Sequence, residues 1–277
     1  MKSTLCLLIS LLCLPFAGRA DELADKGRDV FKKHQRAVVT VQVVQKMTYT
    51  SGGRTSEPTE MKQDITGTVM DASGLIVLAL SAVDVGELYK RMDPRYKVET
   101  EVSDVKILLD DGAEIPAEIV LRDKALDLAF IRAKSKPARP MAAVDFGQAS
   151  KVDVLDQVVT LNRLGRAAGR AYSASVERIS AVVHKPRTFY VPDSTMTGTA
   201  LGSPAFALDG NIVGILVMRS ISSGGGDSMN NFRPDNLTSI ILPAEDIVKA
   251  AKQAPEAKGD EPKKVEAKAT TTEPEKK

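Results

Sequence analysis

Apolar and polar positions alternate along much of the chain, in short runs that are typical of strands. The runs are rich in Val, Ile and Leu and end at Gly- and Asp-containing turns. Residues 65–70 and 75–80 flank the turn at residues 71–74, which predicts a hairpin. The Asp-Asp-Gly turn at residues 110–112 predicts a second hairpin of the same kind.

The predicted strands fall into two sets, separated by the Pro-containing basic segment at residues 134–140. The first set comprises residues 37–50, 65–70, 75–80, 105–109, 114–123 and 126–133. The second set comprises residues 154–162, 170–183, 187–191, 203–208, 212–218 and 237–242. Helical periodicity is convincing only at residues 23–34 and 243–254. This pattern predicts an all-β protein of two barrels or sandwiches.

The N-terminal segment, residues 1–20, has the features of a secretory signal peptide. Lys2 precedes an apolar run, and Gly18, Arg19 and Ala20 form a small-residue cleavage site. The apolar run over residues 5–16 is shorter than the roughly 20 residues that span a bilayer as a helix. We therefore expect cleavage after Ala20, a secreted or periplasmic protein and no transmembrane segment in the mature chain.

The rest of the chain divides into three parts. Residues 21–138 are expected to form an N-terminal β-barrel, and residues 139–252 a C-terminal β-barrel with a terminal helix. Residues 253–277 are rich in Lys, Glu, Pro, Ala and Thr, which predicts a disordered tail. Two long loops are predicted at residues 86–103 and 222–235.

Composition excludes several kinds of chemistry. Cys6 and Cys13 are the only cysteines, and both lie in the signal segment, so the mature chain has no disulfide, thiol nucleophile or thiolate metal site. With only two histidines as well, no metal or cofactor is expected. The signal segment holds two of the 38 basic residues and none of the 36 acidic residues. The mature chain is therefore formally neutral, which gives no argument for nucleic-acid binding.

Four segments occur in an order that resembles the chymotrypsin-like serine proteases, most closely the HtrA-type branch. They are TGTVMDASGLIVLALSAVD, VKILLDDGAEIPAEIVLRDKALDLAFI, VPDSTMTGTALGSPAFALDGNIVGI and LTSIILPAEDIVKAAK. The resemblance implies two six-stranded antiparallel β-barrels with a short N-terminal helix and a C-terminal helix. The family often carries a C-terminal peptide-binding PDZ domain, which we do not expect after residue 252.

The resemblance also implies where a catalytic triad would lie. In the family a serine attacks the acyl carbon, a histidine takes its proton and an aspartate orients the histidine. The aspartate falls on Asp127, but the histidine falls on Ser81 and the serine on Leu201. Thr199 stands where the family has the glycine of the oxyanion turn, of which Leu201 is the other position. The expectation is a degenerate site in which Ser81, Asp127 and Leu201 meet between the barrels. Ser81 Oγ or nearby backbone N–H groups are expected to donate hydrogen bonds to Asp127.

Three functions remain open at this stage. The leading one is an inactive protease-fold protein that binds an extended peptide or protein in the cleft between the barrels. The second is an active serine endopeptidase with a displaced site, for which Ser203 is the candidate nucleophile. His34 and His184 are the only histidines, and both are expected at the surface, away from the base position. The third is a structural envelope protein.

Overall fold

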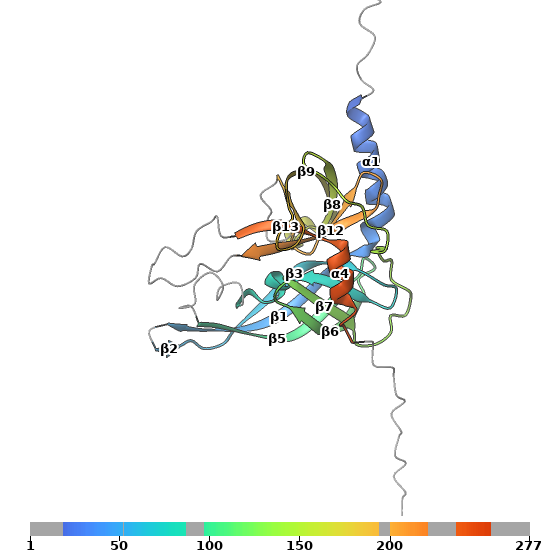
Figure 1. Ribbon diagram of the computed structural model, residues 1–277. Helices are drawn as coiled ribbons and strands as arrows, with labels where there is room; N and C mark the ends of the chain where they lie inside the picture. The colour runs from blue at the N-terminus through green and yellow to red at the C-terminus, as the bar shows by residue number, and fades with distance from the viewer. Residues whose placement is uncertain (1–18, 52, 87–96, 194–199, 221–236, 256–277) are drawn as a thin grey trace, which may run out of the picture.

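The computed structural model describes residues 19–51, 53–86, 97–193, 200–220 and 237–255. These residues form two antiparallel β-barrels that lie against each other (Figure 1). The predicted signal segment up to residue 18, the tail from residue 256, Thr199 and most of both predicted long loops lie outside the described residues.

The first barrel closes because its first and last strands pair. Six strands follow the order β1-β3-β4-β7-β6-β5, and β5 pairs back onto β1, while the short β2 extends the sheet beside β1. Alternate valines of β1 (Val39, Val41 and Val43) lie in one hydrophobic core. The strands are β1 (Val38–Ser51), β2 (Arg54–Thr55), β3 (Thr59–Val69), β4 (Leu75–Ala79), β5 (Lys97–Leu108), β6 (Glu114–Asp123) and β7 (Leu128–Ala133).

The loop predicted at residues 86–103 is partly wrong, because β5 begins at Lys97. Val98 is buried, whereas Glu99 and Glu101 are exposed. The outward charges give the segment a polar composition, but β1 supplies the hydrogen-bonding partner that makes it a strand.

The second barrel is also closed, in the order β10-β13-β12-β11-β8-β9. The prediction of two six-stranded antiparallel barrels with terminal helices is therefore confirmed. The strands of the second barrel are β8 (Gln157–Arg163), β9 (Tyr172–Val183), β10 (Phe189–Pro192), β11 (Pro204–Ala207), β12 (Ile212–Ser220) and β13 (Leu237–Pro243).

The helix α1 (Arg19–His34) runs along the second barrel, and α4 (Ala244–Ala251) lies against β12 and β13 (Figure 1). Although α1 precedes the first barrel in the chain, it packs on the second, where Phe31 meets the ring of Tyr172 edge-on. Among the described residues, no helix is both long and apolar enough to cross a membrane. The shorter helices are α2 (Leu80–Val83), η2 (Gln35–Ala37) and η3 (Arg166–Ala168).

The C-terminal end of α1 is fixed by His34, for which the predicted surface position is wrong. Its side chain is buried and stacks on Phe206 of β11, with ring centroids 4.3 Å apart. Nε2 lies 3.0 Å from the carbonyl oxygen of Gly210, so it donates a hydrogen bond there. The sequence places His34 at a helix end but does not show that a second-barrel strand covers it. His184, in contrast, is exposed as expected.

We predict that His34 makes the stability of the fold depend on pH. Burial, with a smaller effect of Lys33, lowers the pKa of His34 below its ordinary value, and the bond to Gly210 only partly opposes this. The unfolded chain therefore binds a proton more readily than the folded one. The stability that neutral His34 gives to the folded state is fully present above about pH 6.5, and it falls as the pH drops toward the folded-state pKa.

The measurement is thermal unfolding at about pH 7.5 and about pH 5, where histidine protonation changes. His34→Gln keeps an amide donor for Gly210 but does not titrate. Its melting temperature should therefore fall less than that of the wild type when the pH is lowered from about 7.5 to about 5. His184→Gln is the control and should behave like the wild type. Equal pH dependence in the wild type and His34→Gln would contradict the assignment.

Candidate functional site at the barrel junction

Two turns of the first barrel bring Ser81 and Asp127 together. Strand β4 ends at Ala79, and the single turn of α2 then carries Ser81. On the other side, the turn between β6 and β7 ends at Asp127, immediately before β7 begins. The sequence pattern places Asp127 inside a strand, but its φ of 58° puts it in the left-handed region, which aspartate tolerates better than most residues.

Asp127 is buried and accepts hydrogen bonds from both barrels. Its Oδ1 accepts from the Ser81 backbone N–H at 2.9 Å, and its Oδ2 accepts from Ser81 Oγ at 2.8 Å. The same Oδ2 accepts from the backbone N–H of Met218 in β12 at 2.9 Å. The predicted donation from Ser81 Oγ and from backbone N–H groups is thus present, although the prediction did not identify Met218 as a donor. The carboxylate therefore links the first barrel to the second.

Leu201, where the resemblance to the proteases places the nucleophile, lies in an apolar environment. It is buried in a cluster that also contains Leu128 of the first barrel and Val217 of the second. Its side chain carries no atom that can attack a carbonyl carbon. Thr199 lies outside the described residues, so the oxyanion turn is defined here only from Ala200 onward.

The turn that carries Leu201 is held against the first barrel by Gly202. Gly202 has a φ of 90°, and a Cβ there would lie 2.3 Å from the carbonyl oxygen of Thr66 in β3. Thr68 Oγ1 also donates a hydrogen bond to the Gly202 carbonyl oxygen at 3.0 Å. Only glycine fits both the backbone conformation and the close approach.

Ser203 does not have the surroundings of a displaced nucleophile. Its side chain is 1% exposed, and its Oγ has no hydrogen-bond partner within the described part of the chain. A catalytic serine requires both access to the substrate and a base within hydrogen-bond reach.

Polar contacts lock another part of the junction. Arg170 Nε lies 2.7 Å from Asp64 Oδ2, and Thr66 Oγ1 donates to Asn162 Oδ1 at 2.5 Å. Burial raises the pKa of Asp64, but hydrogen bonds from Arg170 and Gln42 outweigh it and hold the pKa below its usual value. These contacts join residues distant in sequence, and no motif in the sequence points to them.

A similar contact joins Asp110 of the first barrel to Tyr172 and Arg163 of the second. Arg163 Nη1 lies 2.9 Å from Asp110 Oδ1, and the Tyr172 hydroxyl donates to the other oxygen. Burial and the Asp110 carboxylate raise the pKa of Tyr172 to about 12. Tyr172 therefore stays protonated and remains a donor at neutral pH.

A cavity of about 500 Å³ opens directly beside Asp127. Its walls combine apolar side chains with three basic ones, and it reaches β12 and β13 of the second barrel. The lining residues are Lys124, Ala125, Leu126, Asp127, Arg187, Val217, Met218, Arg219, Ile240 and Leu242.

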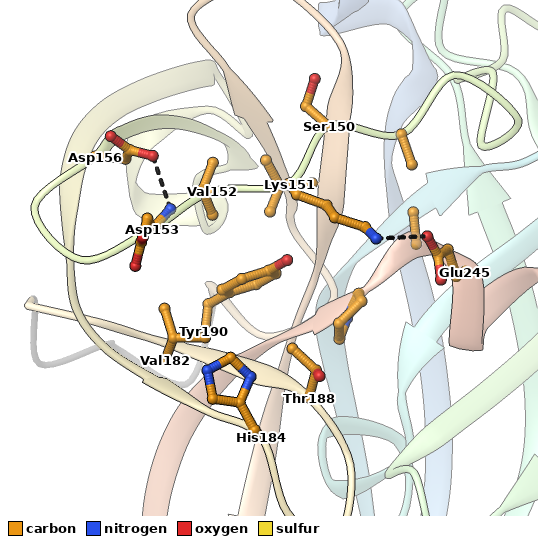
Figure 2. Close-up of a pocket in the computed structure, with 14 residues that line it drawn as sticks. Ser150, Lys151, Val152, Asp153, Asp156, Val182, His184, Thr188, Tyr190 and Glu245 are labelled. Carbon is orange, nitrogen blue, oxygen red and sulfur yellow. Dashed lines mark hydrogen bonds and ion pairs between the residues drawn. The ribbon is translucent and has the colours of Figure 1, made fainter.

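A second cavity, of about 510 Å³, lies in the second barrel and contains none of the triad positions (Figure 2). Tyr190 and His184 line it together with Lys151, which reaches to within 4.0 Å of Glu245. Burial raises the pKa of Tyr190. The mixed charges of this cavity do not point to one class of ligand.

Two closed barrels that meet at such a junction define the chymotrypsin-like protease fold. The chain belongs to the trypsin-like peptidase domain family, whose model matches residues 65–215, more than half of the chain. It is similar to DegP-like curated relatives and to solved structures of HtrA-type proteases.

Two curated relatives illustrate the extent of the similarity. A probable periplasmic serine endoprotease DegP-like of Bartonella henselae is 32% identical over 123 residues, which is 43% of this chain and 24% of the relative. A putative protease Do-like 14 of Arabidopsis thaliana is 25% identical over 165 residues, which is 57% of this chain and 36% of the relative. The chain therefore matches only about a quarter to a third of these proteins.

Solved structures of HtrA-type proteases share the fold. One, described with a decapeptide, has a TM-score of 0.58 at 16% identity and covers 82% of this chain and 65% of its own. Another, described with a tripeptide, has a TM-score of 0.53 at 16% identity and covers 82% and 62%. At this identity the likeness establishes the fold alone.

Replacing Asp127 should destabilise the junction. Asp127→Ala leaves three donors without their acceptor and places alanine at a positive φ, for a loss of roughly 2–4 kcal/mol in the free energy of unfolding. The melting temperature should then fall by roughly 5–15 °C. Ser81→Ala removes one hydrogen bond and should lower it less.

Asp127→Asn is the matched control, because asparagine tolerates the backbone conformation. The asparagine side chain has an NH2 group in place of one carboxylate oxygen, and this donor would lie opposite the Met218 N–H or the Ser81 donors. The Asp127→Asn variant should therefore still be less stable than the wild type. An unchanged melting temperature in Asp127→Ala would show that the carboxylate bonds do not hold the junction together.

Proposed function

We propose that the chain is a pseudoprotease, which keeps the protease fold to bind an extended peptide and performs no covalent catalysis. One observation carries the proposal. The Asp127 carboxylate, which would orient a histidine in a protease, is bonded to the hydroxyl and N–H of Ser81 and to the N–H of Met218.

The missing groups are the ones that the reaction needs. A serine hydroxyl in place of the histidine cannot accept a proton near neutral pH, so it is no general base. Leu201 is not a nucleophile, and the burial of Ser203 disfavours the alternative of a displaced active site. Both histidines are engaged or placed elsewhere: His34 bonds to Gly210 and His184 lines the other cavity.

Strand β12 offers an edge to which a peptide can add. Strand β11 pairs with β12 only as far as Ile215. Among the described residues, the later part of β12 therefore pairs only with β13, and its other edge has no strand partner. Leu216 bonds to Gly202 and Ser203, and the Met218 N–H bonds to Asp127, both on the side away from β13. By alternation, the Met218 carbonyl and the Ser220 backbone groups point to that open side. Main-chain bonds to an added strand would supply affinity.

The relatives support both the ligand class and the location. The two HtrA-type structures are described with bound peptides. The curated bacterial relative is described as periplasmic, which agrees with the predicted signal segment. We therefore place the proposed peptide-binding protein outside the cytoplasm, in the periplasm or secreted.

The absence of catalysis is tested with a fluorophosphonate probe and an unfolded protein substrate. The wild type should neither label nor cleave. Ser81→His with Leu201→Ser restores three side chains but should label weakly, because Thr199 occupies the oxyanion turn. Adding Thr199→Gly should increase labelling, since one oxyanion donor is worth about 100- to 1,000-fold in an intact enzyme.

Ser203→Ala in the wild type is the control for a displaced site. Labelling of the wild type that Ser203→Ala abolishes would overturn the proposal in favour of an active serine endopeptidase. Circular dichroism of each variant shows whether a lack of labelling reflects unfolding.

A further inference from the structure

The cavity beside Asp127 is strongly asymmetric in charge. Lys124 comes from the turn between β6 and β7, Arg187 from the connection between β9 and β10, and Arg219 from β12. Outside the signal segment the chain is formally neutral, so this cluster is a local feature. The fold therefore brings basic side chains from three segments that are far apart in the sequence to one cavity.

The residues that line the cavity carry more positive than negative charge. Asp127 is the one acidic residue among those that line the cavity, and both of its oxygens accept hydrogen bonds from Ser81 and Met218. Within the described part of the chain, Arg187 and Arg219 form no ion pair. The Arg219 guanidinium lies over the ring of Phe189, 4.8 Å from the centroid, which orients it without cancelling its charge.

The rest of the cavity wall is apolar. Val217 of β12 and Ile240 and Leu242 of β13 are buried, and Leu126 and Met218 are partly buried beside them. The cavity adjoins the part of β12 that, among the residues that the structure describes, pairs with a strand only on the β13 side. An extended chain added to β12 would therefore place its side chains between an apolar wall and three cations.

We propose that this cavity selects extended peptides in which an acidic side chain neighbours an apolar one. The inference rests on the proposed peptide-binding function and specifies its ligand. A carboxylate placed here meets the positive charge of Arg187 and Arg219, whereas a lysine meets repulsion, and partial desolvation strengthens both effects.

The experiment measures fluorescence anisotropy of labelled ten-residue peptides with the mature wild-type protein. One peptide alternates valine with glutamate, and matched peptides carry glutamine or lysine at the glutamate positions. The glutamate peptide should bind most tightly and the lysine peptide most weakly. Added salt should weaken binding of the glutamate peptide more than that of the glutamine peptide.

Charge reversal gives the sharper test. Arg187→Glu should weaken binding of the glutamate peptide by roughly three- to tenfold, since it replaces an attraction with a repulsion. Lys124→Glu combined with Arg187→Glu should make the protein prefer the lysine peptide, a result that unfolding cannot produce. Arg139→Glu, an exposed residue of the segment between the barrels, is the matched charge control and should keep the wild-type preference.

The possible outcomes separate the two proposals. Binding of all three peptides with equal affinity would overturn the acidic preference but leave the peptide-binding function in place. A lack of binding by every peptide would overturn the peptide-binding function itself, and the acidic preference with it. An unchanged preference in the double variant would show that the selectivity arises outside this cavity.

Discussion

A buried carboxylate must find donors, and Asp127 finds them in both barrels. The Ser81 N–H and hydroxyl come from the first barrel, and the Met218 N–H comes from the second. An unpaired charge in a protein interior is strongly destabilising, so Asp127 needs all of these donors. Because the donors come from two barrels, the full set of bonds forms only when the barrels take this relative position. The remaining contacts of the junction, from Gly202 against Thr66 to Asp64 with Arg170, depend on the same placement.

This constraint gives Asp127 a structural role that does not require a histidine beside it. Ser81 supplies a donor where the resemblance to the proteases places the histidine, so Asp127 keeps a hydrogen-bonded partner on that side. Loss of the carboxylate would leave donors from two barrels unsatisfied. The hydrogen bonds of Asp127 therefore indicate a structural role for this residue, which is separate from any role in catalysis.

The sequence predicted those features that local chemistry determines. The hairpin turn at Gly74 and the alternating valines of β1 identify strands without tertiary information. The resemblance also led to Ser81 and Asp127, which the structure places in contact. Backbone donors to Asp127 were expected, but Met218 could not be identified as one of them, because a backbone N–H carries no sequence signature. The same holds for His34, whose burial depends on a strand far along the chain.

The cations beside Asp127 were missed for a similar reason: they converge only after both barrels have closed. The position of these cations matters because the proposed function includes no covalent reaction. A protease gains rate only from contacts that strengthen in the transition state. A protein without that reaction has no transition state to favour, so all of its complementarity is to the bound peptide itself. Main-chain bonds to β12 accept any sequence, and discrimination must come from the side chains around that edge. In this cleft those side chains are an apolar wall and Lys124, Arg187 and Arg219.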